Sequence, residues 1–170
     1  KKITRTGLSA TIGNTDDAAQ FLVGTNKPCK IIKDKSVRKY EVEVKFVGGT
    51  ISEVADSIIE YVEKLDLDSP ILLFTNTRGE SEFLASILRD KTMMNIELHH
   101  GSLSKQVREE TEGILRSGNR GIVVCTSSLE LGLDIGSVEL VIHYGSPRQV
   151  SKLVQRIGRS RHTRNSSARG

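Results

Sequence analysis

Continuous apolar runs, separated by segments of helical periodicity, constrain the fold of this chain more than any other feature of its sequence. Ile71-Leu72-Leu73-Phe74 and Ile122-Val123-Val124-Cys125 lack the polar alternation of a strand with one face in water. Such runs are typical of parallel strands that are buried on both faces. Shorter strands are predicted at residues 96–99 and 138–142.

The segments between these runs have the periodicity of amphipathic helices. Helix 52–65 is predicted to bury Val54, Ile58 and Val62, and helix 80–88 to bury Phe83, Leu84, Ile87 and Leu88. A third helix is expected from a Ser104 cap to Gly118, and a fourth begins near Val150. Strands that alternate with helices in this way predict an α/β fold, a mainly parallel sheet with helices on both faces in a three-layer α/β/α arrangement.

The N-terminal part of the chain is less regular. Residues 1–12 are predicted to end a strand, residues 14–22 to form a capped helix, and residues 29–32 a short strand. Charged residues 33–39 are predicted to form a connector, and the alternating segment 40–47 a half-buried edge strand. We expect Cys29 and Cys125 to be buried thiols, because neither has further ligands at metal-binding spacing.

Polar residues follow every predicted strand of the regular region. Parallel sheets bind ligands at the carboxyl ends of their strands, where these residues are expected to gather. The four segments are rich in hydroxyls, amides, glycine or basic groups, and this composition favours a phosphate-rich ligand over chance. They are Thr75-Asn76-Thr77-Arg78, His100-Gly101-Ser102, Thr126-Ser127-Ser128 and His143-Tyr144-Gly145-Ser146.

Positive charge is concentrated at the C-terminal end. No acidic residue follows Glu139, whereas seven basic residues do, so the first 139 residues have 18 basic against 21 acidic side chains, a net charge of −3. A helix from Val150 towards His162 would bury Val150, Leu153, Val154 and Ile157 on one face. Gln155, Arg159 and His162 would lie on the other face, with Arg156 near its edge. Guanidinium groups held on a rigid element suit a polyanion.

Five short motifs, in this order and spacing, resemble those of superfamily 2 helicases. Ser9-Ala10-Thr11 resembles motif III, and the motif IV-like segment spans residues 73–78. Residues 99–103 resemble an adjoining motif of the Ski-like branch, residues 126–134 resemble motif V, and residues 155–162 resemble motif VI. The sequences of the last two motifs are most similar to those of the large helicase-related (Lhr) branch. The resemblance implies a RecA-like (P-loop NTPase-type) second motor domain.

The resemblance also implies a division of the chain. Residues 1–36 would be the tail of a first motor domain with a connector, and residues 37–170 the second RecA-like helicase C-terminal domain. No phosphate-loop pattern and no acidic Mg²⁺-binding tetrad occur in the chain. In the family both belong to the first motor domain, an upstream partner in the same chain that would supply the Mg²⁺ ligands. We therefore expect ATP hydrolysis from the intact protein and not from this fragment.

The family's nucleotide-binding roles fall on motifs V and VI. Arg159 matches an arginine finger that reaches the γ-phosphate of ATP, where a fixed cation meets the charge of phosphoryl transfer. Gln155 and Arg156 would support the same cleft, Gly132 would lie near the nucleotide, and Asp134 near the ribose or a motif VI arginine. The second arginine finger of the family has no exact match. Arg161, before His162, is either its substitute or a surface cation.

The family's nucleic-acid roles fall on the loops after the strands. The resemblance implies that Thr75, Arg78, His100, Gly101 and Thr126 contact the strand backbone. Hydroxyls and N–H groups hold phosphates without reading bases, as a translocating motor requires. Ser9 and Thr11 would couple the two motor domains. The expected partner is single-stranded or partly duplex DNA, with RNA also open, and no metal site is predicted in this chain.

Two alternatives remain open from the sequence. One is a non-catalytic nucleic-acid-binding or regulatory module that has kept the fold, which a phosphate loop upstream would argue against. The other is a small-molecule enzyme of the dinucleotide-binding type, disfavoured because no Gly-x-Gly-x-x-Gly pattern follows the first strand. No membrane-length apolar run and no signal peptide are visible, so a soluble cytoplasmic protein is expected.

Overall fold

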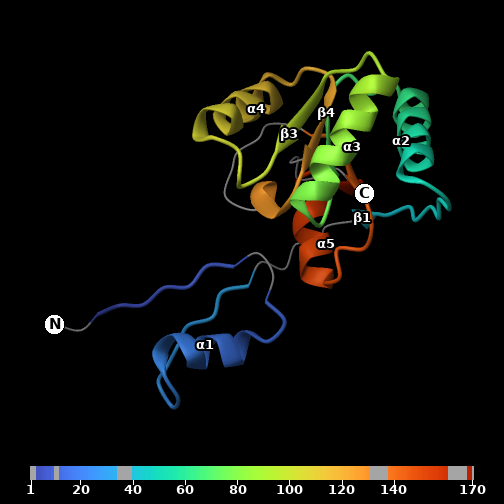
Figure 1. Cartoon of the computed structure of the whole chain (residues 1–170). Coiled ribbons are helices and arrows are strands. Elements are labelled where there is room, and N and C mark those ends of the chain that lie inside the picture. The colour runs from blue at the N-terminus through green and yellow to red at the C-terminus, as the bar shows by residue number, and fades with distance from the viewer. Residues whose placement is uncertain (1–2, 10–11, 34–39, 131–137, 161–167, 170) are drawn as a thin grey trace. The chain divides into compact units, whose positions relative to one another are not determined.

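The computed structural model describes residues 3–9, 12–33, 40–130, 138–160 and 168–169 of the chain (Figure 1). The chain forms two compact units, Lys1–Val37 and Arg38–Gly170. Within the described residues, no helix is both long and apolar enough to cross a lipid bilayer.

The described part of the first unit contains the predicted helix but neither predicted strand. Helix α1 (Thr15–Val23) begins at an Asn14 cap, whose side chain accepts hydrogen bonds from the backbone N–H groups of Asp16 and Asp17. Residues 3–9 and 29–32 have no strand structure, because a strand needs a partner and neither segment has one among the described residues. The prediction for Cys29 was wrong, since this thiol is exposed.

The second unit is built on a four-stranded sheet, and all its pairs of neighbouring strands are parallel. The strand order is β3-β4-β2-β5, so the chain runs from β2 to the edge at β3, returns inward to β4 and then crosses to the other edge at β5. The strands are β2 (Pro70–Phe74), β3 (Ile96–His99), β4 (Gly121–Cys125) and β5 (Leu140–His143). The predicted parallel sheet is confirmed, and both continuous apolar runs are its central, fully buried strands.

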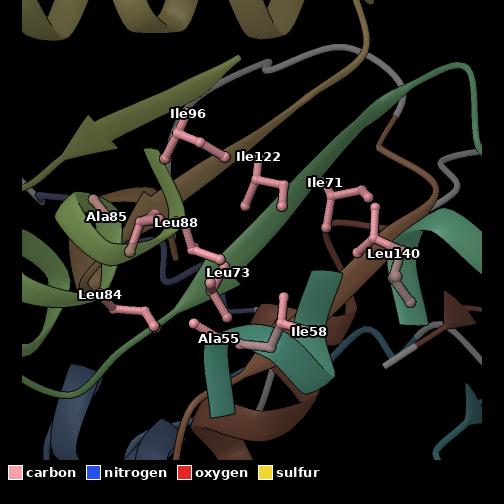
Figure 2. Packing of buried hydrophobic residues seen from close by; sticks show 12 residues of the cluster. Ala55, Ile58, Ile71, Leu73, Leu84, Ala85, Leu88, Ile96, Ile122 and Leu140 are labelled. Atoms are coloured by element: carbon pink, nitrogen blue, oxygen red, sulfur yellow. The ribbon is translucent and has the colours of Figure 1, made fainter. Parts of the chain in front are cut away.

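Helices cover both faces of this sheet. Helices α2 (Ile51–Leu65) and α3 (Arg78–Lys91) pack on one face through Ala55, Ile58, Leu84 and Leu88, which meet side chains of all four strands (Figure 2). Helix α4 (Lys105–Ser117) covers the other face with Leu115. The three-layer prediction is therefore confirmed. The inward position predicted for Phe83 was wrong, because this side chain is 57% exposed.

Local signals set the ends of these helices, and two of them, the Ser104 cap and the Gly118 end, were predicted. Thr50 and Thr77 each form a capping box with the glutamate three residues later, Glu53 and Glu80. Ser104 caps α4, and Gly118 ends it with a φ of 73°, a left-handed conformation that glycine adopts without steric cost.

The predicted strand at residues 40–47 was mostly wrong. Only β1 (Tyr40–Glu41) is a strand, and it pairs in parallel with β6 (Ala168–Arg169). Residues 42–47 have no ladder partner among the described residues, and Val44 and Phe46 are 90% and 94% exposed. A groove of about 800 Å³ lies between this segment, α2 and β5.

Candidate functional site

The carboxyl ends of the four parallel strands lie at one edge of the sheet, as predicted. Backbone hydrogen bonds tie the loops that follow them: Thr75 N–H donates to Cys125 O (2.8 Å), Thr126 N–H to His99 O (3.2 Å) and Tyr144 N–H to Phe74 O (2.8 Å). The polar residues that follow the strands are therefore brought together across about 70 residues of sequence.

Arg78 and Thr75, which both follow β2, differ in their exposure to solvent. Arg78 is exposed at the start of α3, where its Nη1 donates to Ser102 Oγ (3.1 Å) in the loop after β3. Thr75 is fully buried, and its hydroxyl donates to Thr77 O (3.1 Å). Arg78 is accessible to a ligand, whereas the burial of Thr75 argues against the predicted contact of its side chain with a nucleic acid.

His99 connects three elements at this edge. This buried side chain lies with Nδ1 2.8 Å from Ser128 Oγ, in the 3₁₀ turn η1 (Ser127–Leu129), and with Nε2 3.3 Å from Glu112 Oε1 in α4. Burial lowers the pKa of His99, although Glu112 opposes the shift. His99 therefore links the loops after β3 and β4 as a largely uncharged group.

The predicted contacts after β3 and β4 differ in accessibility. His100 is buried, with its Nε2 3.2 Å from Glu82 Oε1 but without the alignment of a hydrogen bond, so its side chain does not face a ligand. Gly101 is exposed, and a Cβ added there would meet no heavy atom within 4 Å. Thr126 is half-buried. The open edge is thus formed by Arg78, Gly101 and Thr126.

Arg156 is buried, contrary to the prediction that it lies near the edge of an exposed helix face. Helix α5 (Val150–Ile157) ends before Gly158, and its buried residues are Arg156 and Ile157, whereas Val150 is 76% exposed. The Arg156 guanidinium donates from Nε to Glu130 Oε1 (2.7 Å) and lies 5.0 Å from the centroid of the Phe74 ring. A buried arginine needs such a counter-charge, because desolvation of an unpaired cation is costly.

Glu130 also holds Arg159, through a different atom. Its backbone carbonyl accepts hydrogen bonds from Arg159 Nε (3.1 Å) and Nη2 (2.7 Å). Arg159 is partly buried, and this burial lowers the pKa of its guanidinium, which still remains charged at physiological pH. Arg156 and Arg159 therefore converge on one residue, which lies 26 and 29 positions earlier in the chain. Gln155, on the same helix, is half-buried.

An aromatic stack extends from this arginine pair into the sheet. The imidazole of His143 stacks on Phe74, with centroids 5.8 Å apart and planes inclined by 24°. Both ring nitrogens of His143 are buried without a hydrogen-bond partner among the described residues. Burial and the nearby Arg156 guanidinium lower the pKa of His143 to about 4, while burial raises the pKa of Cys125.

Several predicted site residues lie outside this geometry. Ser9 is exposed in the first unit. Thr11, Gly132, Asp134, Arg161 and His162 lie outside the described residues. Within the described ranges, no group of three or more His, Cys, Asp or Glu side chains is placed to hold a metal ion.

The sequence reasoning missed Glu130 and the partners of His99. Glu130 is the only carboxylate in segment 126–131, which follows a strand whose end was expected to bind phosphate, and this was a usable signal. Ser128 and Glu112 carried no such signal, because a polar residue in a loop or on a helix surface is ordinary.

Comparison with known proteins identifies relatives of this chain. The profile of the helicase conserved C-terminal domain matches residues 53–163. The ATP-dependent helicase Lhr-Core of Methanocaldococcus jannaschii is 40% identical over 98% of this chain, and that of Saccharolobus solfataricus is 39% identical over all of it. The chain spans only 20% and 21% of these two relatives.

A solved structure agrees with the sequence relatives. The helicase Lhr of Mycobacterium smegmatis, bound to single-stranded DNA and AMP-PNP, superposes with a TM-score of 0.82 and 33% identity. The similarity covers 96% of this chain and 23% of the other. The fold is therefore the RecA-like fold of a helicase motor domain, in agreement with the predicted resemblance to the Lhr branch.

Proposed function

This chain belongs to the helicase conserved C-terminal domain family, and we propose that it is the second motor domain of an ATP-dependent helicase or translocase. In this proposal residues 37–170 form the motor domain, and residues 1–36 end the first motor domain and lead out of it. One structural observation carries the proposal. Two arginines of one motif are gathered on Glu130 at the ligand-binding edge of a parallel sheet.

The arginine pair suits the stabilisation of a transferred phosphoryl group. Arg159 is a partly buried cation whose guanidinium is held in one orientation by two hydrogen bonds to the same carbonyl. We assign it the role of arginine finger, since preorganised charge costs no reorganisation during reaction. Arg156 cannot reach a ligand from its buried position, so it supports the cleft from within the domain.

The remaining nucleotide contacts are assigned by family resemblance. Gln155, Gly132 and Asp134 would complete this half of an ATP site. The adenosine triphosphate, with Mg²⁺, would supply the phosphoryl group, and its metal ligands would come from the first motor domain. The M. smegmatis relative was solved with AMP-PNP, an ATP analogue, which supports this assignment.

The nucleic-acid strand would lie along the loops after β2, β3 and β4. Arg78 offers a charged fork, Gly101 allows close approach of a backbone, and Thr126 offers a hydroxyl. Thr75 and His100 would hold these loops from beneath without touching the strand. The relative bound to single-stranded DNA supports DNA as the partner.

The experiment is ATP hydrolysis by the intact protein, with and without single-stranded DNA or RNA. We expect turnover that the strand stimulates, and Arg159→Ala should lower kcat by about 10³-fold or more while strand binding persists. Arg120→Ala, which removes an arginine paired with exposed Asp66, is the matched control. Full activity of Arg159→Ala would refute the finger assignment.

A second variant tests the strand-binding edge. Arg78→Ala should weaken strand binding and reduce the slope of log K against log salt by about one, since one phosphate contact is lost. If the intact protein binds a strand in a salt-sensitive way but shows no turnover, it is a binding module rather than a motor.

A further inference from the structure

We propose that Glu130 is the positioning residue of this half-site, and that its side chain sets the orientation of Arg159 although the two side chains do not pair. The inference rests on the proposed function and deepens it. Glu130 is not among the site residues that the resemblance implies, and it is the last residue that the structure describes before position 138.

The geometry forms a chain of contacts that starts in the sheet. Phe74 is fully buried in the central strand β2, and Arg156 lies 5.0 Å from its ring centroid. Arg156 donates to the Glu130 carboxylate at 2.7 Å, and the two side chains are only 3% and 9% exposed. Glu130 is thereby attached to the rigid core by a charge-assisted hydrogen bond.

The last contact, between the Glu130 carbonyl and Arg159, restrains the Arg159 guanidinium. The Glu130 carbonyl accepts from both Nε and Nη2 of Arg159, so the position of this oxygen helps to fix the plane of the guanidinium. The carbonyl is present whatever the side chain at position 130. The backbone N–H of Glu130 donates to Ser127 O (3.0 Å), and the carboxylate, through Arg156, adds a second restraint on where the carbonyl points.

Loss of the carboxylate charge should therefore change the position of the Arg159 guanidinium. Arg156 Nη1 is already buried without a hydrogen-bond partner among the described residues, so the Glu130 carboxylate is the main compensation for its charge. Without it, Arg156 would move towards water and the carbonyl of residue 130 would be released. Misplacement of a catalytic group by about 1 Å lowers the rate by about a hundredfold.

The test compares Glu130→Gln, which is isosteric, with wild type in the intact protein. We expect kcat for strand-stimulated ATP hydrolysis to fall about a hundredfold, with KM for ATP and strand affinity changed less than about threefold. Glu130→Asp keeps the charge but shortens the side chain, and its kcat should lie between those of wild type and Glu130→Gln. Ile58→Ala, in the core on the opposite sheet face, controls for thermal destabilisation of similar size.

A double-mutant cycle with Arg159→Lys, measured as the rate of single-turnover ATP hydrolysis, separates an effect on the position of Arg159 from a general loss of folded structure. If Glu130 acts through Arg159, Glu130→Gln should cost much less in the Arg159→Lys background than in wild type. Independent, multiplicative losses, or an equal fall in kcat for Ile58→Ala, would overturn the inference. Wild-type rates for Glu130→Gln would also overturn it and leave the motor function intact, whereas absence of turnover in the wild type would overturn the proposed function itself.

Discussion

Protonation of His143 is expected to destabilise the second unit at mildly acidic pH. The folded protein holds this imidazole against Phe74 and near the Arg156 guanidinium, with both ring nitrogens buried. The unfolded chain exposes the same group to water, where it takes up a proton near its ordinary pKa of 6.5. The perturbation we choose is His143→Phe, which keeps an aromatic ring on Phe74 but cannot be protonated.

The magnitude follows from the pKa difference between the two states. The folded pKa of about 4 lies below the unfolded value of 6.5, so the unfolded state binds more protons between these values. Stability that is present above pH 6.5 is therefore lost as the pH falls towards 4. Integration of this difference from about pH 7.5 to about pH 5 corresponds to a loss of about 2 kcal/mol in the free energy of unfolding.

The assay is urea unfolding of the 170-residue chain at these two pH values, followed by circular dichroism. His99, whose pKa burial also lowers, contributes to the loss of stability in wild type as well. The loss in wild type minus the loss in His143→Phe isolates the contribution of His143, provided that the m-value is unchanged. An equal pH dependence in both proteins would refute the assignment of a buried, uncharged imidazole at this position.

Two further predictions concern the scaffold that carries the site. Leu73→Ala should lower the free energy of unfolding, measured in urea, by about 2–5 kcal/mol, because this side chain is fully buried between the sheet and helices α2 and α3. Val44→Ala, at a 90% exposed position, is the control and should change it by less than about 0.5 kcal/mol. Thr77→Ala removes the capping box with Glu80 and should cost about 1 kcal/mol by the same assay, and an unchanged midpoint would show that this cap contributes nothing.

Local patterns in the sequence were sufficient for the layers of the fold and the edge that carries the site. The apolar runs that include Leu73 and Val124 became central strands, because only a strand covered on both faces buries such a run. Helix ends at Ser104 and Gly118 followed from caps that involve residues within one turn. Parallel strands also dictated that their carboxyl ends, and hence the polar loops, share one edge.

Longer-range contacts decided what the local pattern left open. Residues 42–47 alternate like a strand but have no described partner beyond Glu41, and a strand forms only when another chain segment supplies its hydrogen bonds. The helical period likewise placed Arg156 near an exposed face, yet tertiary packing buried it against Phe74 and Glu130. A helical pattern contains information only about residues that are close in the sequence. The carboxylate that compensates the charge of buried Arg156 lies 26 residues away and comes close to it only in the folded structure. The sequence by itself thus indicated many residues of the site but not Glu130, and tertiary structure decided which of them are accessible and which hold the others in place.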